Sequence, residues 1–162
     1  MDVEKVAILI DVQNVYYTTK QAFGRHFDYN AFWAQATTER EVVAAIAYAV
    51  DRGDTKQRQF QNILRGIGFE VKLKPFIQRR DGSAKGDWDV GITLDAVELA
   101  EQVDRLILVS GDGDFDLLLQ RVRQRFDTAS DVYGVSRLTA ESLVRSATRF
   151  VAIDDALLLP LH

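Results

Sequence analysis

Two aspartates stand in a short turn between an apolar segment and a helical segment, within the sequence RLILVSGDGDFDLLL at residues 105–119. Asp112 and Asp114 are separated by one glycine, so their carboxylates are held close together. Like charges at this spacing are disfavoured unless a cation or a proton relieves the repulsion. The pair is therefore a candidate metal site. The alternative is that one aspartate simply caps the helix that follows.

A metal ion in this protein has to be held by oxygen atoms. The chain of 162 residues contains no cysteine and only two histidines, His26 and His162. Carboxylates and other oxygen ligands suit Mg2+ or Mn2+. The composition therefore favours Mg2+ or Mn2+ as the cofactor, and it excludes a disulfide, a thiolate metal site and a cysteine nucleophile.

The segments around the turn predict an α/β fold. Residues 106–109 are apolar without alternation, as expected of a central parallel strand covered on both faces. Residues 41–50 suit a helix by their alanines and a strand by their valines, and we predict a strand because a polar turn ends them. Further strands are expected at residues 5–10, 69–76, 129–135 and 150–153, with helices between them, including residues 88–102 and 139–147.

This alternation predicts a three-layer α/β/α sandwich with a mainly parallel central sheet, in one domain over residues 1–162. Parallel strands all end at one edge of the sheet, so Asp11 and Asp112 are expected to be neighbours. Asp89 lies near the start of the helix before the central strand. Asp95 is about 120° further around that helix, so it either reaches the same ion or stays outside it as an acceptor or a solvated charge.

Three motifs in order carry a resemblance to a known family. They are IDVQN at residues 10–14, KGDWDVGITLDA at residues 85–96 and SGDGDF at residues 110–115. Together they resemble the NYN domain in its LabA-like branch, within the PIN-like ribonuclease superfamily. The resemblance spans nearly the whole chain, and it implies a PIN-like fold.

The resemblance implies an endoribonuclease that depends on Mg2+ or Mn2+ and hydrolyses RNA phosphodiester bonds without a protein nucleophile. Asp11, Asp89, Asp112 and Asp114 match the acidic pocket and are the expected catalytic and metal-binding residues, and Asp95 matches the second helix aspartate as a further metal ligand. The residues expected to bind the substrate are polar or basic and lie beside the acids or in the adjoining loop: Asn14, Lys85, Ser110, Arg79 and Arg80.

Two positions leave alternatives open. Asp87 and Trp88 stand between Gly86 and Asp89 where many relatives have a single residue, so the register of Asp87 against Asp89 is not fixed. Ser110 either bonds a carboxylate or serves as a small turn residue, and turns commonly use serine, which favours the second role.

The charge distribution allows a phosphate backbone as a partner, and the resemblance implies that this backbone is RNA. A formal net charge of −4 argues against adhesion to nucleic acid by bulk charge. Local basic groups beside an acidic pocket suit a phosphate backbone, although solvated charged faces are the more common use of such residues. The basic groups are Lys72, Lys74, Arg79, Arg80 and Lys85, and then Arg121, Arg123 and Arg125.

The sequence also bears on location and assembly. It shows no secretion signal and no apolar segment of membrane-spanning length, so we expect a cytoplasmic protein without a membrane partner. The RNA partner is either single-stranded or structured, and a homo-oligomer is left open.

Several aromatic residues and one histidine have both a structural and a functional interpretation. Tyr16, Tyr17, Phe32 and Trp33 are capable of stacking on bases, but aromatic residues at such spacings more often fill a core, which is what we expect for most of them. His26 is expected on the surface rather than as a general base. Trp88, which follows the basic loop, either fills the core or lines the substrate entrance.

Other functions fit the motifs less well. A haloacid dehalogenase-type phosphatase needs a second acid two positions after Asp11, where Gln13 stands. A dinucleotide-binding domain needs a glycine-rich turn there, and a Toprim-like domain needs a glutamate in place of Asp11. The serious alternative is a non-catalytic PIN-like module that binds RNA or another protein.

Overall fold

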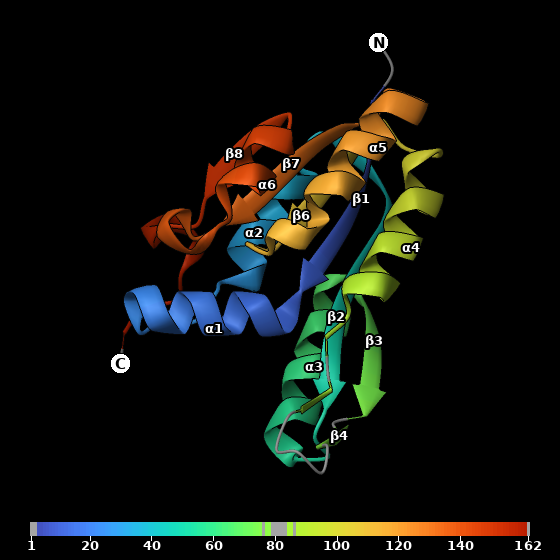
Figure 1. Ribbon diagram of the computed structural model, residues 1–162. Helices are drawn as coiled ribbons and strands as arrows, with labels where there is room; N and C mark the ends of the chain where they lie inside the picture. The colour runs from blue at the N-terminus through green and yellow to red at the C-terminus, as the bar shows by residue number, and fades with distance from the viewer. Residues whose placement is uncertain (1–2, 76, 79–83, 86, 162) are drawn as a thin grey trace.

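The computed structural model describes residues 3–75, 77–78, 84–85 and 87–161. Among these residues, six strands form one sheet that lies between two layers of helices (Figure 1). The strands of the sheet are β1 (Glu4–Asp11), β2 (Arg40–Asp51), β3 (Glu70–Pro75), β6 (Arg105–Val109), β7 (Ala129–Gly134) and β8 (Arg149–Ala152).

The helices connect these strands in the order that the sequence predicts. Helices α1 to α3 precede β3, and helices α4 to α6 lie between β3 and β8. Their bounds are α1 (Val12–Phe23), α2 (Tyr29–Thr37), α3 (Thr55–Ile67), α4 (Asp89–Ala100), α5 (Asp116–Phe126) and α6 (Glu141–Ser146), with single 3-10 turns η1 (Gly113–Phe115), η2 (Ser136–Leu138) and η3 (Asp155–Leu157). No described helix is long and apolar enough to cross a bilayer.

The order of the strands creates a switch point in the middle of the sheet. The strands lie side by side as β3-β2-β1-β6-β7-β8, and every neighbouring pair is parallel. The chain builds outward from β1 through β2 and β3, and then returns to the other side of β1 with β6. Open α/β sheets bind ligands at the carboxyl ends of strands at such a switch point. Asp11 ends β1 at this place, beside the end of β6.

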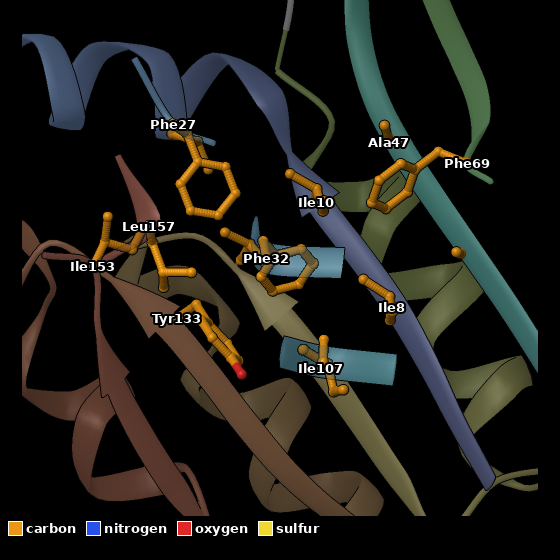
Figure 2. Packing of buried hydrophobic residues seen from close by; sticks show 14 of the residues in the cluster. Ile8, Ile10, Phe27, Phe32, Ala47, Phe69, Ile107, Tyr133, Ile153 and Leu157 are labelled. Carbon is orange, nitrogen blue, oxygen red and sulfur yellow. The ribbon is translucent and has the colours of Figure 1, made fainter. Parts of the chain in front are cut away.

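Both faces of the sheet are covered by packed side chains. Ile8 and Ile10 of β1 point toward α1, α2 and α3, where they join Phe32 and other buried residues (Figure 2). Ala7 and Leu9 point toward α4, α5 and α6. Because neither face meets water, the central strands contain no alternating polar residues, as their sequences indicated.

The expected architecture is confirmed, with local differences. Residues 41–50 are a strand, since β2 is paired on both sides by β1 and β3. Pro75 ends β3, an edge strand where a missing N–H is tolerated. Within the loop expected at residues 79–86, Ala84–Lys85 instead form strand β5, which pairs with β4 (Ile77–Gln78). The remaining residues of that loop lie outside the described part of the chain.

A buried carboxylate links the first residues of several strands. Asp131 of β7 has 0% of its surface exposed, and it accepts hydrogen bonds from Arg105 Nη1 at 2.6 Å and Arg149 Nη2 at 2.8 Å. Glu4, which is partly exposed, pairs with Arg105 and Arg40. A charge buried among such partners is strongly destabilising when one member of the network is removed.

We therefore expect Asp131→Asn to lower the free energy of unfolding by about 3 kcal/mol, because the substitution leaves arginines without their buried counter-charge. Glu4→Gln is the matched control and should cost less than about 1 kcal/mol, since Glu4 is open to solvent. Urea unfolding of the two variants and the wild type measures both values. Equal losses in the two variants would show that burial of Asp131 is unimportant.

Candidate metal centre

Asp11 joins strand β1 to helix α1 and faces the switch point. Its Oδ1 atom accepts from the backbone N–H of Asn14 at 3.4 Å, which caps the helix, and its Oδ2 atom accepts from Ser110 Oγ at 3.2 Å. Burial is the main cause that raises the pKa of Asp11 to about 6, and the charges of Asp112 and Asp87 add to it. Burial and the neighbouring acids thus both disfavour the negative charge of Asp11.

The turn after β6 presents two more carboxylates. Asp112 Oδ1 accepts from the backbone N–H of Asp114 at 2.9 Å, so Asp112 caps the 3-10 turn η1. The turn is tied to α1 because Gly111 N–H donates to Asn14 Oδ1 at 2.9 Å. Gly111 has no space for a side chain, since a Cβ atom would lie 2.7 Å from the carbonyl oxygen of Leu138. The turn is therefore held from both sides.

Helix α4 brings the fourth carboxylate, and Trp88 fixes where that helix begins. Trp88 Nε1 donates to the carbonyl oxygen of Ala49 at 2.8 Å, and its ring lies 5.3 Å from the ring of Tyr48. Lys74 Nζ lies 4.6 Å from the centre of the same indole. Trp88 is therefore packed against β2, and Asp89 directly after it is aimed at the switch point.

Asp89, Asp112 and Asp114 converge. Each of the three offers one carboxylate oxygen, and these oxygens all lie within 4.8 Å of one another. The pKa of Asp89 is raised, first by burial and then by hydrogen bonding and charge from Asp112, with smaller contributions from Asp87 and Asp11. The structure thus gathers like charges from two separate segments of the chain, the start of α4 and the turn after β6.

This donor set fits a divalent cation. Neighbouring ligands on an octahedral ion with metal–oxygen distances of about 2.1 Å lie about 3 to 4 Å apart. One carboxylate oxygen from each of Asp89, Asp112 and Asp114 lies within 4.8 Å of the others, which is close to that spacing. The donors are all carboxylate oxygens, the chemistry that Mg2+ and Mn2+ prefer.

Asp95 lies outside this group of three. Its Oδ2 atom accepts from Lys72 Nζ at 2.7 Å and from the Tyr48 hydroxyl at 2.8 Å. Burial and the bond to Asp95 raise the pKa of Tyr48, so this hydroxyl keeps its proton. The structure thus gives Asp95 a lysine and a tyrosine as partners, and a metal-binding role for Asp95 stays a prediction.

The other predicted residues fall into two groups. Asn14 and Ser110 lie next to the acids, with side chains that hydrogen-bond to the turn and to Asp11. Lys85 lies in β5, and only its backbone is described, whereas Arg79 and Arg80 lie outside the described residues. The roles of these residues in binding a substrate stay predictions.

Two open alternatives are resolved by contacts. Asp89 belongs to the group of three, whereas Asp87 is exposed and its Oδ1 atom accepts from the backbone N–H of Asp89 at 3.1 Å. The favoured interpretation of Ser110, as no more than a small turn residue, is wrong. Ser110 is 1% exposed, donates to Asp11 and accepts from the backbone N–H of Asp112, so it connects two acids.

The aromatic residues divide differently from the expectation. Phe32 is buried and Trp33 packs against Phe69, as expected of core residues. Tyr16 and Tyr17 are 42% and 50% exposed, so the expectation of a core position is wrong for them. The helical spacing of α1 could have identified the tyrosines as exposed. Val15 and Thr19 form the buried face of this helix, and both tyrosines lie away from that face.

Comparisons with known proteins agree with this architecture. The model of the NYN domain family matches residues 5–154. The low amplitude and bright protein LabA of Synechococcus elongatus is 28% identical over 159 residues, which cover 93% of this chain and 84% of that protein. The crystal structure of VPA0982 from Vibrio parahaemolyticus, a protein of unknown function, is 66% identical with a TM-score of 0.93, and the match covers 97% of both chains.

The raised pKa of Asp11 predicts how stability depends on pH without metal. The ordinary value is 3.8 and the folded value is about 6, so the folded protein binds this proton more tightly than the unfolded chain does. The free energy of unfolding should therefore fall as the pH rises from about 4 to 7. Asp11→Asn keeps the cap and removes this charge, so we expect a gain of about 2 kcal/mol at pH 8.

Urea unfolding at a series of pH values, with a chelator present, measures this dependence. Glu98→Gln on the exposed side of α4 is the control and should follow the wild-type curve. If Asp11→Asn is less stable than the wild type at pH 8, burial of the Asp11 charge does not destabilise the fold.

Proposed function

The chain belongs to the NYN domain family, and from this membership and its acidic cluster we propose that it is a metal-dependent endoribonuclease that hydrolyses RNA phosphodiester bonds. The observation that carries the proposal is the convergence of Asp89, Asp112 and Asp114 at the switch point of the sheet. Caps alone do not account for this arrangement, because only Asp112 of the three accepts a capping hydrogen bond from the described backbone.

Asp89, Asp112 and Asp114 are the residues that would hold Mg2+ or Mn2+. When bound, such a cation makes water more acidic and stabilises the negative charge that develops on the phosphate. Asp11 adds a fourth carboxylate behind this group, with its oxygens oriented by Ser110 Oγ and the Asn14 N–H. The chain needs no nucleophile of its own for this reaction. Water attacks the phosphorus, the bond from phosphorus to one ribose oxygen breaks, and that oxygen leaves as a hydroxyl group after it takes up a proton.

Asn14 and the basic residues would position the phosphate. The side-chain oxygen of Asn14 is occupied by Gly111 N–H, so its NH2 group is the part that would donate to a phosphate oxygen. Arg121 and Arg125 are exposed on α5, the helix that follows the acidic turn, and they supply positive charge for the backbone on either side of the cleaved bond. Lys85, Arg79 and Arg80 are proposed to add to this charge.

The activity is tested with labelled single-stranded and hairpin RNA incubated with Mn2+, with Mg2+ and with a chelator. We expect cleavage that depends on the metal and that falls at least about a hundredfold in Asp89→Asn and Asp112→Asn, because a lost ligand removes several kcal/mol of transition-state stabilisation. Asp127→Asn is the matched control, since Asp127 is an exposed residue with a left-handed backbone that asparagine tolerates.

Two outcomes would contradict the proposal. Binding of RNA without metal-dependent cleavage would indicate the non-catalytic PIN-like module instead. Equal loss of cleavage in Asp127→Asn would show that the variants act through general damage to the fold rather than through the acidic cluster.

Metal binding is measurable without any substrate. Mn2+ should raise the midpoint of thermal unfolding of the wild type, because an ion bound only by the folded state stabilises it. At a hundred times the dissociation constant the gain is about 2.7 kcal/mol. Asp112→Asn should lose most of this gain, yet without metal it should be at least as stable as the wild type, because crowding of like charges is relieved. A loss of stability without metal would mean that Asp112 acts mainly as a cap.

A further inference from the structure

A cavity of about 850 Å³ lies between helix α1, the segment before α2 and helix α3. Its volume is in the range of sites that bind small organic groups. Aromatic and aliphatic side chains form most of its wall, among them Val12, Tyr16, Tyr17, His26, Phe60 and Ile63. The acidic cluster does not include any of these residues.

The cavity adjoins the acidic cluster along two segments of the chain. Val12 and Gln13 line the cavity and directly follow Asp11. Ala49 lines it too, and its carbonyl oxygen accepts from Trp88, the residue before Asp89. A molecule bound in the cavity would therefore lie next to whatever is bound at the acids.

The wall presents exposed aromatic side chains. Tyr16 and Tyr17 lie edge to face with their centres 5.4 Å apart, and Tyr16 stacks on His26 at 5.8 Å with an angle of 21° between the planes. Both tyrosines are more than 40% exposed, at 42% and 50%. Exposed aromatic faces beside a polar site are the surfaces on which proteins stack unpaired bases.

The charges around the cavity suit a nucleic-acid strand. Lys56 lines it, and Lys20 Nζ lies 5.5 Å from the centre of the Tyr16 ring. Asp28 and Asp54 also line it, but their carboxylates cap α2 and α3 by accepting backbone N–H groups. The cations are thus placed to meet a phosphate backbone at the cavity.

We propose that this cavity binds one or two nucleobases of the RNA strand whose phosphate lies at the acidic cluster. This inference rests on the proposed function, and it names the bases as a part of the RNA that the protein recognises. Bases in a duplex are paired and stacked, so they cannot enter the cavity. The enzyme should therefore prefer single-stranded RNA, through contacts with bases as well as with phosphates.

The test measures base recognition apart from cleavage. A labelled single-stranded RNA of about ten nucleotides and a matched strand that lacks its bases are titrated with Asp112→Asn protein in Mn2+. Stacking on one aromatic side chain contributes about fivefold to a hundredfold in affinity. We expect the strand with bases to bind more tightly by this factor, and we expect Tyr16→Ala or Tyr17→Ala to remove most of that preference.

Two further variants serve as control and confirmation. Phe23→Ala removes an aromatic ring that is 38% exposed on the same helix but does not line the cavity, so the preference should be unchanged. Ile63 is 57% exposed on α3 and lies in the cavity wall opposite the tyrosines. Ile63→Ala should therefore reduce the preference for the strand with bases without affecting the fold. Tyr17→Phe keeps the ring and should keep the preference.

The outcomes separate the two proposals. The cavity proposal is overturned if the strand without bases binds equally well, or if both tyrosine variants keep the full preference. Absence of metal-dependent cleavage by the wild type, with the base preference intact, would refute the nuclease and leave base binding in place.

Discussion

The crowding of carboxylates where β1 and β6 end is the constraint on which the rest of the site depends. The buried acids have two kinds of surroundings. Asp131 is buried among arginines that neutralise it. Asp11 is also buried, but the hydrogen bonds recorded for it come from neutral groups, Ser110 and a backbone amide. Among the described residues, neither Asp11 nor the three clustered acids form an ion pair, and a divalent cation is what such a site is suited to accept.

Holding these acids in place requires contacts between segments far apart in sequence. The parallel pairing of Ile10 with Val109 sets Asp11 beside Ser110, and Ser110 in turn bonds the backbone of Asp112. Trp88 anchors the start of α4 to β2, which directs Asp89 inward. Each acid is thus placed by the end of a rigid element or by a turn fixed from both sides, which keeps the repulsion from spreading the carboxylates apart.

The sequence predicted the sheet and the group of acids because both follow from general rules. Apolar runs identify buried strands, and parallel connection brings their ends together. The sequence did not favour a hydrogen bond from Ser110 to Asp11, because the sequence of β1 or of β6 alone does not determine how the two strands are aligned. The sequence did not show the partners of Asp95 either. Helical spacing gives the direction of Asp95 around α4, but it does not show that Lys72 of the edge strand β3 pairs with it.

Helix α1 connects the acidic cluster with the cavity, because it follows Asp11 directly and carries both exposed tyrosines. The helix begins at the cap that Asp11 supplies, and Val15 and Thr19 anchor it to the sheet. Tyr17 lies six positions after Asp11, a rise of about 9 Å along the helix. Because one rigid helix carries both groups, the distance from the acids to the ring faces is fixed before any substrate arrives. This fixed spacing is what the proposal requires of a strand that has its phosphate at the acids and a neighbouring base at the tyrosines.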